Sequence, residues 1–248
     1  MKILVCLSIV PDTTTNIRFS GPQDALDPTG IQWIINPWDE LALTRALEIR
    51  ESDSGVTQVS VLHVGLKEAD PVIQKALAVG ADSAFRINAS PADSLETATR
   101  ISEFVSNEKF DVIITGYESA DYNGSAVGGM LAELLGWTSF SAVSSLTISQ
   151  SVITLERETD SLTETIRASA PVVLTIQKGI AKDPRIPSLR GIMTARSKPL
   201  TVIEPANGQP AVRMIHFELP APRTKCRMID PSNAGELIDL LRNEANAL

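Results

Sequence analysis

Four near-continuous apolar runs along the chain predict the buried strands of a parallel sheet. Strands of such a sheet are covered on both faces, so they are apolar throughout rather than at alternate positions. The runs are Ile3–Val10, Val59–Val64, Asp111–Thr115 and Val172–Ile176.

Helical patterns with clear start and stop signals separate these runs. Asn36 is expected as an N-cap, with Pro37 at the first helical position and Asp39 and Glu40 in the first turn. Strand–helix–strand alternation implies right-handed crossovers, which predicts an α/β fold with a parallel sheet and helices on both faces. Further helices are expected over Asp70–Gly80, over Ser94–Val105, and from the loop after Thr115 to Gly136.

The pattern changes in the second half of the chain. Val152–Glu158 and Glu164–Ala168 predict an antiparallel hairpin, and the segment from 199 onward is rich in proline. It ends in one amphipathic helix, Asn233–Asn246. We therefore expect an α/β domain over residues 1–198 and an extended arm over 199–248, which could fold back on the domain or wrap a partner.

Composition argues against several classes of protein. The chain has 248 residues, 43% of them hydrophobic, and a net charge of −8, which argues against non-specific binding to nucleic acid. No run approaches the ~20 apolar residues of a membrane helix, and the first residues lack the apolar core of a signal peptide.

The few cysteines and histidines argue against a metal site and against disulfides. Cys6, Cys226, His63 and His216 are not closely spaced, so neither a zinc site nor a disulfide framework is expected. We expect a cytoplasmic protein without metal.

The charge is unevenly distributed. Between Lys178 and Lys198 there are six basic residues and one acid, so this segment carries +5 and the rest of the chain −13. A solvated loop and a docking surface for an acidic partner both explain this pattern.

The most informative stretch is the glycine-flanked loop from Gly116 to Gly129, between a predicted strand and a helix. Ligands of open parallel sheets bind at the carboxyl ends of strands, near helix N-termini. Small residues let backbone N–H groups approach an anion, and the helix dipole favours negative charge there. A phosphate site and a simple turn are both compatible with the pattern, because it matches no standard phosphate motif.

Several motifs in order resemble the beta subunit of the electron transfer flavoprotein family over nearly the whole chain. They are Val10–Asp12, Asn36–Glu40, Ala76–Asp82, the loop from Gly116 to Gly128 with Asp121, Glu156–Glu158, and Asp183–Arg185 running on to Met193. The resemblance implies a Rossmann-like fold that binds an adenine nucleotide.

Relatives of this kind bind AMP as a structural ligand, while the redox-active FAD is held mainly by the alpha subunit. No catalytic residue is expected in this chain. The resemblance implies an AMP pocket lined by Cys6, Asn36, Val64, Gly65, Ser119, Asp121, Tyr122, Asn123, Gly124, Ser125, Ala126 and Val127. Backbone amides of Gly124–Val127 would hold the phosphate.

The resemblance also implies contacts outside that pocket. Thr13 and Trp38 would lie near the flavin, and Glu158 would pair with an arginine of the alpha subunit. Leu189, flanked by Arg185 and Arg190, corresponds to the leucine that docks client dehydrogenases. The expected partners are the alpha subunit, flavin-dependent dehydrogenases such as acyl-CoA dehydrogenases, and a quinone reductase as acceptor.

Three alternative functions are compared with the sequence features that bear on them. Electron-bifurcating relatives place a second FAD in the beta site, but Tyr122 and Ala126 here favour AMP. An ATP-using ligase or hydrolase of the same superfamily would need a glycine-rich loop after the first strand, where this chain has Ser8–Asp12. A stand-alone module of the universal stress type would lack the basic segment and the arm.

Overall fold

The structure is a computed structural model that describes residues 1–20, 25–52, 55–205, 210–212, 214–222 and 226–248. In this part of the chain a nine-stranded sheet has the order β11-β5-β4-β1-β6-β10-β7-β8-β9. The strands from β11 to β7 are parallel, while β8 and β9 are antiparallel to their neighbours. The strands are β1 Lys2–Cys6, β4 Gln58–Val64, β5 Ser83–Ile87, β6 Val112–Gly116, β7 Thr138–Ser149, β8 Val152–Glu158, β9 Thr163–Ala168, β10 Val172–Ile176 and β11 Leu200–Ile203.

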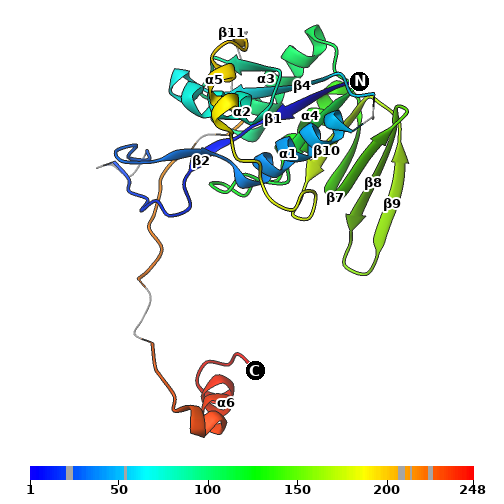
Figure 1. Ribbon diagram of the computed structural model, residues 1–248. Helices are drawn as coiled ribbons and strands as arrows, with labels where there is room; N and C mark the ends of the chain where they lie inside the picture. Colours follow the sequence, from blue (N-terminus) through cyan, green and yellow to red (C-terminus); the bar gives the residue numbers. More distant parts are fainter. Residues whose placement is uncertain (21–24, 53–54, 206–209, 213, 223–225) are drawn as a thin grey trace.

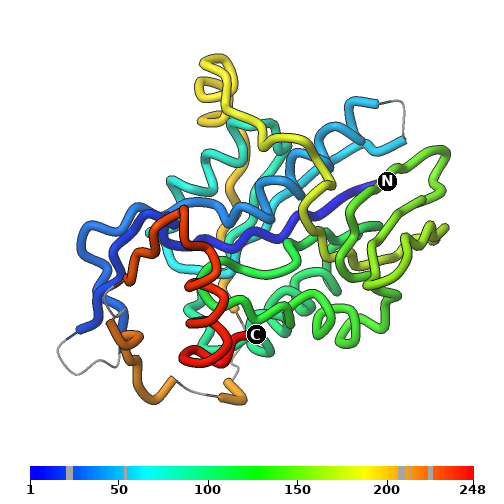
Figure 2. The backbone as a smooth tube through the Cα atoms, turned by 90° about the horizontal axis from the view of Figure 1, so that it is seen from below, coloured from blue at the N-terminus to red at the C-terminus, as the bar shows by residue number. Residues whose placement is uncertain are grey.

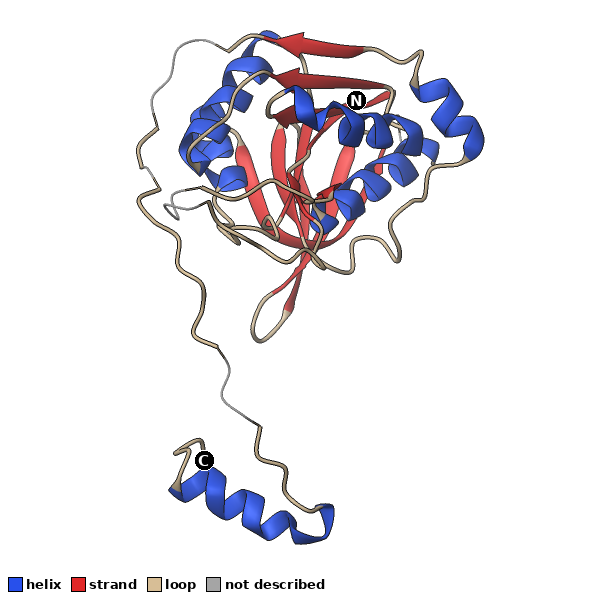
Figure 3. Cartoon of the chain, turned by 90° about the vertical axis from the view of Figure 1, so that its left-hand side faces the viewer, coloured by secondary structure: helices blue, strands red, loops and turns tan. Residues whose placement is uncertain are grey.

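Helices cover both faces of this sheet, as predicted (Figure 3). On one face lie α1 and α2; on the other lie α3 and α4. Alternate residues of one strand therefore enter different cores: Val5 packs under α1, whereas Leu4 packs under α3 and α4. The helices are α1 Pro37–Glu51, α2 Asp70–Val79, α3 Ser94–Asn107, α4 Val127–Leu135, α5 Leu189–Ala195 and α6 Ala234–Asn243, with short 3₁₀ turns η1 Lys67–Ala69 and η2 Pro231–Asn233.

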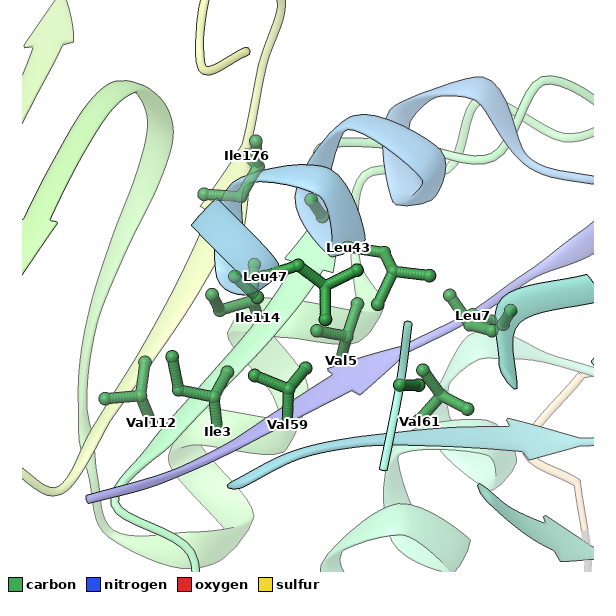
Figure 4. Packing of buried hydrophobic residues seen from close by; sticks show 14 of the residues in the cluster. Ile3, Val5, Leu7, Leu43, Leu47, Val59, Val61, Val112, Ile114 and Ile176 are labelled. Carbon is green, nitrogen blue, oxygen red and sulfur yellow. The ribbon is translucent and has the colours of Figure 1, made fainter. Parts of the chain in front are cut away.

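The core beneath α1 explains why the apolar runs form strands. Leu43 and Leu47 of α1 point down onto the sheet, where they meet Val5 of β1 and Ile114 of β6 (Figure 4). All four side chains are at most 1% exposed. Burying such a side chain contributes about 1.5–3 kcal/mol, so these contacts fix the helix over the central strands.

Helix ends follow the predicted signals. Helix α2 ends at Gly80, whose φ of 145° favours glycine, and α4 ends at Gly136 in the left-handed region. The antiparallel hairpin is also confirmed, with Glu158 of β8 opposite Thr163 of β9.

Two predictions about strands are wrong. The run Ile3–Val10 is not one strand: β1 ends at Cys6, and Ile9–Pro11 form β2, which pairs antiparallel with β3, Trp33–Ile35. The chain turns away because Ser8 bonds to the start of α1 instead of to the sheet. Leu200–Ile203, expected in the arm, instead form β11 beside β5.

The remainder of the arm lies apart from the sheet. Its described part ends in α6, which stands clear of the α/β body (Figures 1 and 3). Leu237 and Ile238 on this helix are 45% and 48% exposed. Residues 206–209, 213 and 223–225 of the expected arm lie outside the described residues. Because β11 belongs to the main sheet, the arm starts beyond Ile203 and not at residue 199; that the rest of it wraps a partner stays a prediction.

Candidate functional site

Three predicted site segments meet at one edge of the sheet. The strands β4, β1 and β6 are neighbours and parallel, so their carboxyl ends lie together. Cys6 ends β1 in register with Leu62, and Val64 ends β4, with Gly65 directly after it. The loop that follows Gly116 leaves β6 at the same edge. From β1 the chain adds β4 and β5 on one side of the sheet and then returns to add β6 on the other side. Open α/β sheets bind ligands at such a reversal of strand order.

The loop after β6 has an unusual backbone. Asn123 and Ser125 have φ values of 50° and 46°, a region that residues with a side chain seldom adopt. Internal hydrogen bonds support it: Asn123 N donates to Ser119 O at 2.8 Å, and Tyr122 N to the Asp121 carboxylate at 2.8 Å. Ser125 is followed by Ala126 in the right-handed region, and adjacent residues of opposite hand can present successive backbone N–H groups to an anion.

Helix α4 begins directly after this loop and has no side-chain cap. Its N-cap residue is Ala126, which cannot accept a hydrogen bond through its side chain. Gly128 lets the helix lie against the sheet, because a Cβ there would meet Thr175 Cγ2 at 2.3 Å and Thr115 Oγ1 at 3.1 Å. An uncapped helix start offers N–H donors and the positive end of the dipole. This edge is therefore suited to hold a phosphate.

Asn36 occupies the predicted N-cap position, but its side chain does not cap the helix. Instead its Nδ2 donates to Glu118 O at 2.8 Å, and its Oδ1 accepts from Ala120 N at 3.1 Å. The side chain is buried, and both of its polar atoms bond to the backbone of the loop. Asn36 is therefore the N-cap residue of α1, as predicted, but its side chain bonds to the loop, whose backbone presents a matching donor and acceptor.

Asp39 also lies at these strand ends, although the sequence analysis did not identify it as a site residue. Its two carboxylate oxygens accept from Ser8 N at 2.7 Å and from Gly116 N at 2.6 Å. Burial raises the pKa of Asp39 to about 7, against the lowering effect of those backbone hydrogen bonds. From the sequence it was only an acid in a first helical turn, which is a frequent surface feature.

Two more titratable groups lie beneath this edge. Burial, followed by the charge of Asp39, raises the pKa of the Cys6 thiol, so this cysteine is a small apolar residue and not a nucleophile. His63 bonds through Nδ1 to Leu7 O at 2.9 Å, and burial lowers its pKa. Neutral His63 therefore supports the end of β1.

The residues expected near a flavin are spread over three elements. Trp38 lies half-buried in the first turn of α1, and Thr13 is exposed just after β2. Glu158 is exposed at the end of β8 in the hairpin. Of the three, Trp38 lies against the strand end at Gly116, where an added Cβ would be 2.7 Å from Trp38 Cβ.

The basic segment forms a projecting surface around α5 (Figure 2). Leu189 is 84% exposed and Met193 76%, on one side of the helix, and Ile186 just before it is 90% exposed. The other side packs closely on α2, where a Cβ on Gly191 would meet Ala78 O at 2.2 Å. An apolar strip of three residues is therefore presented on a firmly held helix.

The basic residues of this surface have different roles. Arg185 forms an ion pair with Glu51 of α1, with Nη1 at 2.7 Å from Oε1, and its backbone N donates to Thr44. Lys198 donates to Leu77 O and Ala81 O, at the end of α2. Arg190 is exposed. Arg185 and Lys198 thus anchor the segment, whereas Arg190 faces outward.

A groove with a volume of about 610 Å³ lies between α2 and α5. Gln74 and Ala78 line it from α2, and Ile192 and Ala195 from α5. It lies beside the exposed apolar strip of α5 and not at the strand ends. At the strand ends, the uncapped start of α4 and the loop before it offer backbone N–H groups to an anion.

Comparison with known proteins identifies the family. A family model described as the electron transfer flavoprotein domain matches residues 25–207. The chain belongs to the electron transfer flavoprotein family. The resemblance stated from the motifs is confirmed, and so is the α/β fold with a mostly parallel sheet.

Curated members of this family are similar over most of their length. The chain is 31% identical to the electron transfer flavoprotein subunit beta of Bacillus subtilis, over 100% of both proteins. It is 32% identical to that of Syntrophomonas wolfei, over 89% of the chain and 86% of the relative. It is 30% identical to the mitochondrial subunit beta of Oryza sativa subsp. japonica, over 100% of both. Members of this family carry electrons.

Of the helices in the described ranges, none is both long and apolar enough to cross a bilayer. The same ranges contain no cluster of three or more His, Cys, Asp or Glu side chains that could hold a metal ion.

Proposed function

We propose that this chain is the beta subunit of a heterodimeric electron transfer flavoprotein. It binds AMP as a structural ligand at the strand ends and pairs with an alpha subunit that holds most of the FAD. Client dehydrogenases, such as acyl-CoA dehydrogenases, dock on it and pass electrons to that flavin, and a quinone reductase accepts them. The bound FAD supplies the electron chemistry, and this chain supplies binding and positioning. We place the protein in the cytoplasm.

The loop and helix that follow β6 carry the nucleotide part of the proposal. Asn123 and Ser125 hold left-handed backbone conformations, and α4 starts without a side-chain cap. Strained backbone of this kind costs about 1–3 kcal/mol per residue, persists only where the surrounding structure fixes it, and is frequent at ligand sites. Backbone N–H groups of Gly124–Val127 are well suited to a phosphate, with adenine toward Val64 and Gly65.

The exposure of Tyr122 bears on the choice between AMP and a second FAD. Tyr122 is 68% exposed, so its ring projects into solvent and does not fill the site. The bulk of Tyr122 therefore gives no steric reason to exclude FAD. We retain AMP as the ligand, and a second FAD, as in electron-bifurcating members, is the competing outcome of the experiment below.

The C-terminal arm supports the pairing with an alpha subunit. Leu237 and Ile238 of α6 are about half exposed, on a helix that stands away from the body (Figure 1). Val212, Ile215 and Leu219 of the arm are 64%, 79% and 63% exposed. Apolar surface of this extent in a single chain is typical of a surface that a partner covers. A stand-alone stress-type module would not carry it.

The strip on α5 supports the docking of client dehydrogenases. Leu189 with its neighbours Ile186 and Met193 provides an apolar anchor, and Arg190 provides exposed positive charge beside it. A buried anchor gives affinity, while charge raises the encounter rate with an acidic partner. Glu158 on the hairpin would pair with a cation of the alpha subunit, and Thr13 and Trp38 would face the flavin.

One experiment tests the proposal as a whole. The chain is co-expressed with a candidate alpha subunit, the complex is purified, and the small molecules released by acid are identified by mass spectrometry. One FAD and one AMP per heterodimer support the proposal, and two FAD per heterodimer indicate a bifurcating protein. A free monomer without any adenine nucleotide contradicts it.

A further inference from the structure

The start of α1 bridges two strands at the point where they separate. β1 and β6 stay in register only as far as Val5 and Ile114. Beyond that pair, the Asp39 carboxylate accepts from Ser8 N on one side and from Gly116 N on the other, at 2.7 and 2.6 Å. One side chain thus replaces the hydrogen bonds that the diverging strands no longer make to each other.

The same helical turn also holds the loop that follows. Asn36 donates to Glu118 O at 2.8 Å and accepts from Ala120 N at 3.1 Å, so it pairs with the loop as a neighbouring strand would. Asn36 is 1% exposed and Asp39 is 2% exposed. Buried polar groups are costly unless their hydrogen bonds are satisfied, and here the partners are the backbone of the site itself.

Close packing at Gly116 leaves this arrangement little freedom. A Cβ on Gly116 would lie 2.4 Å from Asp39 Oδ1 and 2.7 Å from Trp38 Cβ. The strand end therefore touches the first turn of α1 directly. Four hydrogen bonds and this contact join Ser8, Gly116, Glu118 and Ala120 to a single rigid turn.

We propose that Asp39 and Asn36 are positioning residues that hold the nucleotide loop in its binding conformation before the ligand arrives. This inference rests on the proposed binding of AMP at the strand ends. Ordering a loop costs free energy for each residue fixed, and a loop ordered by the fold does not incur that cost on binding. Without these two side chains, the binding of AMP itself must order residues 116–120, which weakens it.

The test uses the purified heterodimer after its nucleotide has been removed. Binding of AMP is measured by calorimetry for the wild type and for Asp39→Asn and Asn36→Ala. We expect each variant to bind AMP ~10- to 100-fold more weakly, because each removes the support of only one or two residues of 116–120, Gly116 for Asp39 and Glu118 and Ala120 for Asn36. The FAD content stays the same. Glu40→Gln is the matched control, because Glu40 lies in the same turn but pairs with Lys75 at the surface, and its affinity should stay within ~2-fold.

Hydrogen exchange separates this inference from the proposed function. In the nucleotide-free heterodimer, the amides of residues 116–120 should exchange faster in both variants than in the wild type. Unchanged exchange together with unchanged AMP affinity overturns the inference and leaves the AMP site standing. If the two variants exchange faster than the wild type but the wild type itself binds no AMP, the positioning role is supported and AMP is ruled out as the ligand.

A purely structural role gives a different result. It would lower the unfolding temperature equally with and without AMP, so that the increment produced by AMP stays that of the wild type, and this outcome also overturns the inference. If Asp39→Asn does not fold, Asn36→Ala keeps the question open to measurement, since it leaves the Asp39 bridge intact.

Discussion

The ring of Phe217 stacks on the ring of Phe19, with centroids 4.8 Å apart and planes inclined by 14°. Phe217 belongs to the C-terminal arm, and Phe19 to the segment between β2 and β3. A second contact lies nearby along the arm: the Asp93 carboxylate accepts from Ala211 N and Val212 N at 2.7 and 2.9 Å. The arm is therefore fixed to the body before it reaches α6.

Loss of the Phe19–Phe217 stack should weaken binding of the alpha subunit. An aromatic pair contributes about 0.5–1.5 kcal/mol beyond its buried area, so Phe217→Ala should raise the dissociation constant ~3- to 10-fold. A titration of purified subunits measures this. Phe19→Ala should have the same effect, and the double variant no more than either one. Additive losses would mean that each ring contacts the partner separately and that the stack has no role.

Gly116 and Gly129 form a matched pair for testing the packing at the strand ends. Gly116→Ala places a Cβ 2.4 Å from Asp39 Oδ1, so the turn must shift and the variant should lose about 1–3 kcal/mol of stability. At Gly129 no atom lies within 4 Å of the added Cβ, and Ala in a helix gains up to about 1 kcal/mol. Denaturant titrations of both variants give the comparison. Equal destabilisation would contradict the close contact.

The sequence predicted the central strands well because burial on both faces leaves a continuous apolar run, as in Val172–Ile176. It did not predict β7, whose residues Thr138–Ser149 are largely polar or small, or β5, which has Arg86 inside it. Arg86 is tolerated there because it pairs with Asp70 at 2.7 Å. A pairing of this kind is a tertiary contact with no local pattern.

The candidate site was predicted only in part for a similar reason. The loop Ser119–Val127 was found through its small residues and the helix after it, which are local signals. Asp39 and Asn36 act on backbone groups of residues 77 and 84 positions away, at Gly116 and Ala120. Backbone amides carry no side-chain signature, so no spacing in the sequence identifies these partners.

Leu189 should control how tightly client dehydrogenases dock. Leu189 is 84% exposed, so Leu189→Ala removes no internal packing and should leave the unfolding midpoint unchanged. Because an apolar anchor residue typically contributes 1 kcal/mol or more to an interface, reduction by a client should slow ~5-fold or more at low client concentration. Stopped-flow absorbance of the flavin measures the rate. Leu134→Ala, at an exposed leucine on α4, is the control, and an equal rate in both variants would refute the docking role.

Arg190 should affect the encounter rate and its dependence on salt. It is an exposed residue of the basic segment, whereas Arg185 is engaged with Glu51. Arg190→Glu should slow reduction by an acidic client several-fold at low ionic strength, and the difference should shrink as salt is added. Lys109→Glu changes an exposed cation outside this segment and should have little effect. A loss that salt does not diminish would indicate a contact role and not electrostatic steering.

Asp39 should give the protein a stability that falls as the pH rises toward neutrality. Burial raises the pKa of Asp39 to about 7 in the folded chain, whereas an unfolded aspartate titrates near ~3.9. Between these values the folded state holds a proton that the unfolded state has released, so the contribution of Asp39 to the free energy of unfolding decreases by up to about 1.4 kcal/mol per pH unit. It is fully present below pH ~4 and lost above pH ~7.

The Asp39→Asn variant cannot titrate at this position and isolates the effect. Urea titrations at pH 5, 6 and 7 should show the wild type losing stability relative to the variant, by about 1–3 kcal/mol over the range. The direction matters more than the size, because the two backbone amides that bond to Asp39 favour the charged form and oppose the effect of burial. Parallel curves would mean that Ser8 and Gly116 stabilise the carboxylate enough to cancel its desolvation, and that Asp39 is charged throughout this range.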